Sequence, residues 1–251
     1  YHMTDPRDTT AADLLRACTT RAIISRAHFA DTSTIHANGG LTQLRAQAPL
    51  IRASYDSVRC KTVLSTLARN HTWVTPTLVS YQPYMHAFDS ASTHPELAKY
   101  VPGLVQGGWL RRASATKPSD STVLGSYFSF ERTRQLKDGG VKMLAGTDMP
   151  QAFVYPGFSL HDELELLVRS GLTPLEALRT ATYNPAEFLG ALDSLGTVTQ
   201  GKVADLVLLD ANPFGDIRNT RRISAVIANG RLFDQAARTK LLKDVETALK
   251  H

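Results

Sequence analysis

Apolar residues recur every three or four positions along much of the chain, and this spacing predicts amphipathic helices. The pattern is clearest between residues 160 and 190, where three short helices follow one another. Gly171 ends the first helix. Thr173-Pro174-Leu175-Glu176 opens the second as a capping box with proline at the first helical position, and Asn184-Pro185-Ala186-Glu187 opens the third in the same way. Further helices are predicted at residues 9–26, 41–52, 55–70, 125–137 and 234–249.

Two apolar stretches are too short for helices and predict buried strands. Residues 72–79 are rich in β-branched and aromatic side chains, and Pro76 indicates a bulge or an end. Residues 141–146 follow Gly139-Gly140, which ends a helix because glycine adopts left-handed backbone angles easily. Asp148 comes next. A carboxylate at the carboxyl end of a buried strand is where α/β folds place their chemistry, although a capping or turn aspartate fits the same residues.

From about residue 195 the helical spacing gives way to short strands. We predict strands at 196–198, 204–210, 223–227 and 231–233, the last two joined by the hairpin turn Asn229-Gly230. Residues 80–121 differ from both parts, because prolines interrupt them repeatedly. They predict a loop-rich insertion with one or two short helices, of the kind that forms a lid over a pocket.

The composition is that of an ordinary globular protein, with 251 residues, a net charge of +5 and 43% hydrophobic residues. Lys and Arg are scattered, so binding to nucleic acid is not expected. No apolar run approaches the roughly 18 residues of a membrane span, and no signal peptide is visible. Cys18 and Cys60 form neither a metal-type pair nor a disulfide framework, which fits a reducing compartment. We therefore expect a cytoplasmic protein.

Several motifs follow one another in a fixed order. They are Val141 to Pro150, Gly157-Phe158-Ser159-Leu160-His161-Asp162-Glu163-Leu164, Gly171 to Leu178, Ala181-Thr182-Tyr183-Asn184-Pro185-Ala186, Gly196-Thr197-Val198, Gly201 to Asp210 and Val226 to Gly230. In this order they resemble the C-terminal half of metal-dependent amidohydrolases, in the subgroup close to imidazolonepropionase-like and prolidase-like members. The resemblance covers about residues 55–235.

The resemblance implies a fold and a metal site. Such enzymes are (β/α)8 barrels with a β-sandwich built from both chain ends, and their last metal-site residue is an aspartate after the eighth strand, which Asp148 matches. The family also needs a His-x-His pair on the first strand, which this chain lacks, and a barrel takes about 250 residues. We therefore expect a truncated α/β protein. Residues 1–3 would be a cloning remnant, 4–194 a partial (β/α)8 barrel, 195–235 a β-sandwich-type module and 236–251 a C-terminal helix.

The resemblance also implies a hydrolase that attacks an amide, peptide-like or ester carbonyl of a small molecule. Zinc or another divalent metal would activate the attacking water, and Asp148 would bind the metal or take the proton. Catalytic zinc needs about three protein ligands, so the others would come from a second copy or a complementary half-chain. His161 is the second candidate catalytic residue. It either faces Asp148 or is hydrogen-bonded to a loop carbonyl.

Two other functions remain open. A non-catalytic truncated remnant would expose the strand edges of its half-barrel and should self-associate into an oligomer. A metal-free promiscuous esterase would need a serine nucleophile. Ser159 could be imagined with His161 and Asp148 as a triad, but no nucleophile elbow surrounds it. Ser114-Ala115-Thr116-Lys117 matches the Ser-x-x-Lys pattern without its companion motifs.

Overall fold

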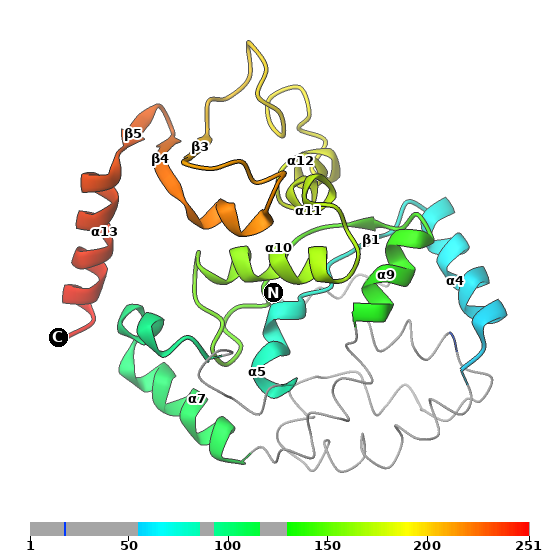
Figure 1. Cartoon of the computed structure of the whole chain (residues 1–251), viewed down its shortest axis with the longest axis horizontal. Coiled ribbons are helices and arrows are strands. Elements are labelled where there is room, and N and C mark those ends of the chain that lie inside the picture. Colours follow the sequence, from blue (N-terminus) through cyan, green and yellow to red (C-terminus); the bar gives the residue numbers. More distant parts are fainter. Residues whose placement is uncertain (1–17, 19–54, 86–92, 116–129, 251) are drawn as a thin grey trace.

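The computed structural model describes Cys18 and residues 55–85, 93–115 and 130–250 (Figure 1). Apart from Cys18, the helices predicted at 9–26 and 41–52 lie outside these residues. The same is true of the first five residues of the helix predicted at 125–137, which begins here at Phe130 as α9, Phe130–Asp138.

The helix α4, Ser57–Arg69, is the first described element and confirms the helix predicted at 55–70. Asp56 caps it, because its carboxylate accepts hydrogen bonds from the backbone N–H groups of Val58 (2.9 Å) and Arg59 (3.0 Å). These groups have no partner inside the helix. Asn70 follows as the C-terminal cap.

A disulfide joins Cys60 of α4 to Cys18, whose Cα atoms are 4.3 Å apart. The backbone N–H of Asp56 also donates to the carbonyl of Cys18 (2.8 Å). The prediction that Cys18 and Cys60 form no disulfide framework was therefore wrong. The two are 42 residues apart, and no spacing motif announces such a pair. Because disulfides are rare in cytosolic proteins, the cysteines give no support to a cytoplasmic location, which stays a prediction.

The strands β1, Trp73–Val74, and β2, Lys142–Met143, form a two-stranded parallel sheet. Trp73 lies opposite Lys142 and Val74 opposite Met143. The backbone N–H of Leu144 adds one more hydrogen bond, to the carbonyl of Val74 (3.0 Å). Both predicted strands are thus confirmed as parallel neighbours.

Both strands are shorter than their apolar patterns predicted. Pro76 has no N–H to donate to a ladder, and Thr77 adopts left-handed backbone angles, so β1 cannot continue. The chain after β2 finds a different partner, because the N–H of Ala145 donates to the carbonyl of Thr180 (2.9 Å). Asp148 therefore lies five residues beyond the last strand residue, Met143, rather than directly at its end.

Three helices follow, as predicted: α10, Ser159–Arg169; α11, Pro174–Ala181; and α12, Tyr183–Phe188. The predicted start of the third at Asn184 was wrong, because Thr182 is its N-cap and the Asn184 side chain donates to the carbonyl of Met143 (2.8 Å) instead. Thr173 and Glu176 form the predicted capping box. Gly171, with φ 106°, ends the first of these helices, since such angles favour glycine. The helix α10 contacts α9, α11 and two 3₁₀ helices, η2, Leu78–Ser80, and η4, Ile217–Arg221. It lies in the middle of Figure 1.

The main core lies between these helices and the parallel strands. It joins residues from α4, β1, β2, α9, α10 and α11, all less than a tenth exposed. Its larger members are Leu64, Val74, Leu78, Val79, Leu136, Val141, Met143, Leu164, Leu166, Leu167, Leu172 and Ile217. Within the described part of the chain, no helix has both the length and the apolar character needed to cross a membrane.

The insertion is more helical than predicted. Its described residues contain α5, Gln82–Met85; η3, Pro95–Tyr100; and α7, Gly103–Ala115, while η2, Leu78–Ser80, leads into it. Trp109 of α7 packs against Phe153 and Tyr155, with ring centroids 5.5 and 5.4 Å away. A small second core therefore fixes α7 against the loop that follows Asp148.

The C-terminal part contains a three-stranded antiparallel sheet in the order β3-β4-β5. The strands are Leu206–Leu209, Ile223–Ala228 and Arg231–Phe233; the 3₁₀ helix η4, Ile217–Arg221, precedes β4, and α13, Gln235–Ala248, ends the described chain. The predicted hairpin is confirmed, with Asn229 at φ 50° and Gly230 at φ 72°. The strand predicted at 196–198 is wrong, because this segment is irregular and Val198 is 85% exposed.

Candidate active site

The chain segments that follow β1 and β2 lie against each other at the carboxyl edge of the parallel pair. A Cβ atom on Gly146 would stand 2.5 Å from Cγ2 of Thr75 and 3.7 Å from Cγ2 of Thr77. The first distance is too short for any real Cβ, so only glycine fits. Parallel sheets place their functional groups at this edge. Thr77 and Asp148, which is two residues after Gly146, thus belong to one edge.

Two residues at this edge have strained backbones. Thr77 has φ 49° and ψ 44°, and Asp148 has φ 55°. Left-handed angles are uncommon outside glycine and are a clear outlier for a β-branched residue such as threonine. Strained residues of this kind concentrate at functional sites, where the surrounding structure holds them in place. Thr77 and Asp148 are two of the six described non-glycine residues with positive φ, and they are the two that belong to this edge.

Asp148 is connected to the insertion through Gln151. The side chain of Gln151 is hydrogen-bonded to the Asp148 carboxylate, and its Oε1 accepts from Nη1 of Arg112 in α7 (3.1 Å). Although Asp148 is exposed as a residue, the protein around its carboxyl group removes enough water to raise its pKa above the ordinary 3.8. The Gln151 hydrogen bond opposes this rise.

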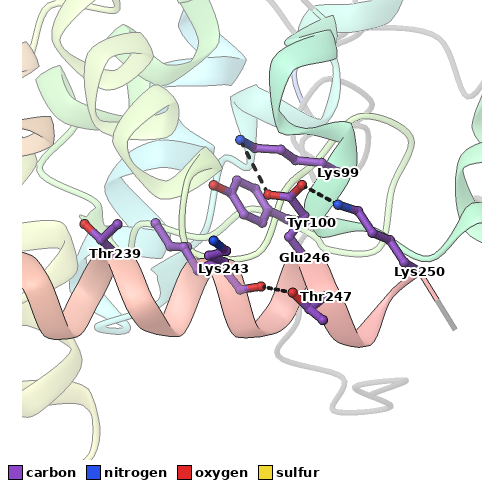
Figure 2. Close-up of a pocket in the computed structure, with 8 residues that line it drawn as sticks. Lys99, Tyr100, Thr239, Lys243, Glu246, Thr247 and Lys250 are labelled. Atoms are coloured by element: carbon purple, nitrogen blue, oxygen red, sulfur yellow. Dashed lines mark hydrogen bonds and ion pairs between the residues drawn. The ribbon is translucent and has the colours of Figure 1, made fainter.

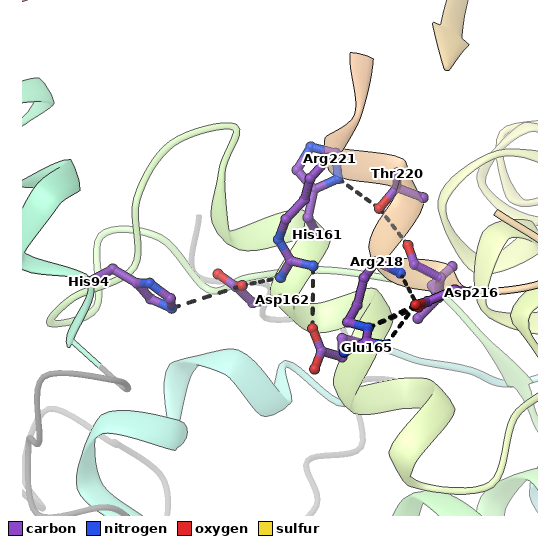
Figure 3. A network of polar contacts seen from close by, with 9 residues as sticks. His94, His161, Asp162, Glu165, Asp216, Arg218, Thr220 and Arg221 are labelled. Atoms are coloured by element: carbon purple, nitrogen blue, oxygen red, sulfur yellow. Dashed lines mark hydrogen bonds and ion pairs between the residues drawn. The ribbon is translucent and has the colours of Figure 1, made fainter. Parts of the chain in front are cut away.

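His161 of α10 has the hydroxyl of Thr220 as its partner, at 3.0 Å from Nδ1 (Figure 3). Thr220 donates its one hydroxyl proton to the carbonyl of Ile217 (2.8 Å), so Nδ1 must be the donor. Burial first, and then the charge of Arg221, lower the pKa of His161, while Asp162 opposes them. A neutral His161 therefore carries its proton on Nδ1 and keeps Nε2 as an acceptor.

The structure does not join the two predicted site residues directly. Among the described residues, no hydrogen bond or ion pair connects His161 with Asp148. The partner of His161 is a hydroxyl of η4 rather than a loop carbonyl. Catalytic roles for both residues stay predictions.

A metal site is not complete in the part of the chain that the structure describes. There, no three His, Cys, Asp or Glu side chains lie close enough together to hold a metal ion. Asp148 could supply one oxygen ligand, whereas a catalytic zinc site takes about three protein ligands. The described residues therefore do not by themselves fit the metal that the resemblance implies.

The hydroxyl groups of the two candidate nucleophilic serines are hydrogen-bonded to the backbone. Ser159 is 1% exposed, and its Oγ accepts a hydrogen bond from the backbone N–H of Tyr155 (2.8 Å). Ser114 donates to the carbonyl of Leu110 within α7 (3.0 Å). A buried acceptor and a helix-bonded hydroxyl are both poorly placed to attack a substrate.

A polar network on the outer side of α10 connects three parts of the chain (Figure 3). Arg221 of η4 pairs with Asp162 and with Glu165 (3.3 Å). His94, at the start of η3, lies 4.0 Å from Asp162. These side chains are partly exposed, so the network braces the surface and contributes little energy.

A groove of about 480 Å³ lies between η3 and α13 (Figure 2). Glu246 stands among its lysines, 2.9 Å from Lys250 and 4.0 Å from Lys99, and these cations lower its pKa. The other lining residues are Tyr100, Thr239, Leu242, Lys243 and Thr247. None of them belongs to the edge that carries Asp148.

Glu163 is a residue that the sequence analysis did not single out. It is 0% exposed, and its Oε2 accepts from the backbone N–H of Val79 (2.8 Å). A signal was present, because position 163 shares a helical face with the buried Leu164 and Leu167. An acid on an apolar face indicates a specific buried partner.

Part of the chain is similar to known proteins. Residues 130–233 match the Amidohydrolase family. Imidazolonepropionase of Thermoplasma volcanium is 30% identical over 126 residues, which cover 48% of this chain and 30% of that protein. Ochratoxinase of Aspergillus niger is 35% identical over 99 residues, 38% of this chain and 20% of that protein.

The fold is also similar to that of a prolidase solved with N-methylphosphonate-L-proline, with a TM-score of 0.52 and 23% identity over 71% of this chain and 41% of that one. This chain thus spans less than a third of the two curated relatives. Their family is one of (β/α)8 barrels and is generally metal-dependent. Residues 130–233 of this chain are thus similar to the Amidohydrolase family, with an imidazolonepropionase among the relatives, and the fold is similar to that of a prolidase.

Proposed function

We propose that this protein is a hydrolase of amidohydrolase type that cleaves an amide, peptide-like or ester carbonyl compound of small size. The observation that carries the proposal is the position of Asp148. It lies inside the segment that matches the family, at the carboxyl edge of a parallel strand pair, on a strained backbone. Burial raises the pKa of Asp148. This brings the pKa closer to the operating pH, where a general base is most effective.

In the proposed reaction Asp148 is the general base. Its carboxylate takes a proton from water while the water oxygen forms a bond to the carbonyl carbon. The same proton then passes to the departing nitrogen or oxygen as the bond between that atom and the carbonyl carbon breaks. Asp148 ends ionised, ready for the next cycle, so protons and electron pairs balance.

Gln151 and Arg112 would orient this base. The hydrogen bond from Gln151 fixes the carboxylate and favours its ionised form, and Arg112 fixes the Gln151 amide from α7. The insertion would thus contribute to catalysis through the position of Asp148. His161, neutral with Nε2 as acceptor, is the second proposed catalytic group and would take or deliver a proton on the substrate.

The family is generally metal-dependent, and a divalent ion would polarise the carbonyl and acidify the water. Asp148 is the described residue that could contribute to such a site. Its other ligands would come from residues outside the described part, from a second copy or from a complementary half-chain. Proton transfer to Asp148 is the step that this chain's described residues support.

The test is hydrolysis of a panel of N-acyl amino acids, dipeptides and aryl esters by the purified chain and by Asp148→Asn. We expect the substitution to lower kcat/KM by about 10²- to 10⁴-fold, the usual contribution of a general base. Asp193→Asn is the matched control, because Asp193 is an exposed acid outside this edge. Equal activity of the two variants would reject the proposal.

Metal dependence is a separate measurement. Metal content is determined by mass spectrometry, and hydrolysis is assayed before and after chelation and after addition of zinc. Loss of activity on chelation and recovery with zinc support a metal-activated water. Activity in metal-free protein that a chelator does not change would reject the metal and leave Asp148 as the base.

A non-catalytic, self-associating protein is the second candidate. The observation that favours it is the exposure of apolar side chains on one face of the antiparallel sheet, 45% for Leu208 and 65% for Leu232. Exposed apolar patches of this kind mark association surfaces. Size-exclusion chromatography with light scattering should then give a dimer or larger species without hydrolytic activity. A monomer at all concentrations would contradict it.

A further inference from the structure

The most unusual buried group in the described structure is the carboxyl of Glu163. It is 0% exposed, and no ion pair of Glu163 occurs among the described residues. Its Oε2 accepts from the backbone N–H of Val79 (2.8 Å), and a second hydrogen bond comes from the backbone of Leu78. In that part of the chain its Oε1 is buried without a partner. Burial of a carboxyl in this state is costly, so the contact needs a structural reason.

The reason lies in the turn that Glu163 contacts. Leu78–Ser80 forms the 3₁₀ helix η2, and Thr77 precedes it with left-handed angles and no side-chain cap of its own. The first N–H groups of a helix have no partner within it. Glu163 supplies that partner from α10, across 84 positions of sequence. It therefore caps a turn that does not cap itself.

The capped turn leads directly to the carboxyl edge of the parallel pair. Thr75 and Thr77 stand within 4 Å of where a Cβ of Gly146 would be, and Gly146 precedes Asp148 by two residues. A change in the turn would therefore move the surface against which the Asp148 segment rests. Inside the turn, the backbone N–H and the hydroxyl of Ser80 both donate to the carbonyl of Thr77 (3.1 and 2.8 Å), and Glu163 of α10 adds the hydrogen bond to Val79 from outside it.

We propose that Glu163 is a positioning residue that holds Thr77 in its left-handed conformation by capping Leu78–Ser80, and so sets the edge beside Asp148. Its consequence for catalysis rests on the proposed hydrolase function, whereas the cap itself does not. Glu163 is too deeply buried to touch a substrate, so it acts through Thr77 and the turn.

The protonation state of Glu163 is consistent with this role. Burial raises its pKa to about 8, and the two backbone hydrogen bonds only partly oppose the rise. Near neutral pH the carboxyl is therefore mostly uncharged, and one oxygen acts as a carbonyl-type acceptor. A glutamine has the same shape and the same acceptor, whereas a methionine of similar length has none.

The test compares Glu163→Gln with Glu163→Met by hydrogen–deuterium exchange of the Leu78 and Val79 amides. We expect Glu163→Met to speed exchange at these amides at least about 10-fold, because the acceptor is lost. Glu163→Gln should stay within about 3-fold of the unchanged protein. Glu165→Met is the matched control, since Glu165 lies two positions along α10 and pairs with Arg221 at the surface.

Thr77→Gly separates capping from simple packing. Glycine adopts left-handed angles without strain, so in a Glu163→Met background it should restore at least half of the lost kcat, although the Val79 amide still lacks its acceptor and keeps exchanging fast. No restoration, or equal exchange in the Gln and Met variants, would overturn the proposal. If Glu163→Met does not fold, exchange in the unchanged protein decides: a fast-exchanging Val79 amide overturns the cap and a protected one supports it.

Hydrolysis assays then separate this inference from the proposed function. We expect kcat to fall about 10-fold in Glu163→Met with little change in KM, and to recover in Glu163→Gln. An unchanged kcat together with the expected exchange would overturn the positioning role. Absence of hydrolysis in every variant, the unchanged protein included, would reject the proposed function, while the exchange result would still test the cap.

Discussion

The two sides of α10 carry acids that differ in almost every physical respect. Glu163 faces inward, is 0% exposed and is bonded to backbone N–H groups of η2. Glu165, two positions along, faces outward and pairs with Arg221 of η4 at 3.3 Å. The same residue type therefore meets an uncharged backbone on one side of the helix and a guanidinium in solvent on the other.

This difference shows how one helix can serve two purposes. The outer acids connect α10 to η4 by charge, which water and salt weaken. The inner acid connects α10 to the turn beside Asp148 by hydrogen bonds in a dry environment, where each bond is strong and each missing partner is costly. Substitutions on the inner side should therefore have larger effects, with a different dependence on pH and salt.

The largest effect is expected in the pH dependence of stability. The pKa of Glu163 rises from 4.5 to about 8 on folding, so the folded state binds more protons than the unfolded state between these values. The stability that this group contributes is then complete below about pH 4.5 and is lost as the pH rises through 8. Between pH 5 and pH 8, the unfolding free energy of the unchanged protein should fall by roughly 3 kcal/mol more than that of Glu163→Gln.

Urea unfolding at each pH measures this difference. Glu165→Gln is the control on the outer side of the helix and should follow the curve of the unchanged protein. Parallel curves for Glu163→Gln and the unchanged protein would mean that Glu163 is ionised throughout this pH range. That result would contradict the difference between the inner and the outer acid of α10.

The next largest effect concerns the edge that the inner acid supports. Gly146→Ala should lower the unfolding free energy by about 2 kcal/mol, because the new Cβ would lie 2.5 Å from Cγ2 of Thr75. Thr75→Ser removes that methyl and should recover most of the loss. Gly103→Ala, where a Cβ meets nothing within 4 Å, should change stability by less than about 0.5 kcal/mol. A silent Gly146→Ala would show that the two segments do not touch.

The smallest effect is expected on the outer side. Arg221→Leu should lower the unfolding free energy by less than about 1 kcal/mol, and 0.5 M NaCl should abolish the difference. Since the charge of Arg221 helps to lower the pKa of His161, the substitution should also raise that pKa, measurable by NMR titration of the imidazole. A large loss of unfolding free energy that salt does not change would show that the outer network stabilises the fold as strongly as the inner contact of Glu163.

The sequence predicts the elements whose signals are local. Thr173 and Glu176 form their capping box from residues three apart, and Asn229-Gly230 sets its hairpin turn by its own backbone preferences. The segment 196–198 shows the limit, since its β-favouring residues pair with no strand among the described residues and the chain there is irregular.

The candidate site depends on contacts between distant residues, and there the sequence is less informative. Asp148 could be found because a glycine-bounded apolar run precedes it. The partner of Glu163 could not, because Val79 lies 84 positions away and a backbone N–H has no sequence signature. The disulfide between Cys18 and Cys60 escaped prediction for the same reason.

The central claim, that Asp148 takes the proton from water, is tested most directly by the pH dependence of kcat/KM in Gln151→Leu. A carboxylate base must be ionised, so activity should fall at acidic pH with a midpoint above 3.8. Because the Gln151 hydrogen bond lowers the pKa of Asp148, its removal should move that midpoint to higher pH, whereas the exposed control Gln235→Leu should not. An acidic midpoint that stays in place in Gln151→Leu would contradict the assignment of Asp148 as the base.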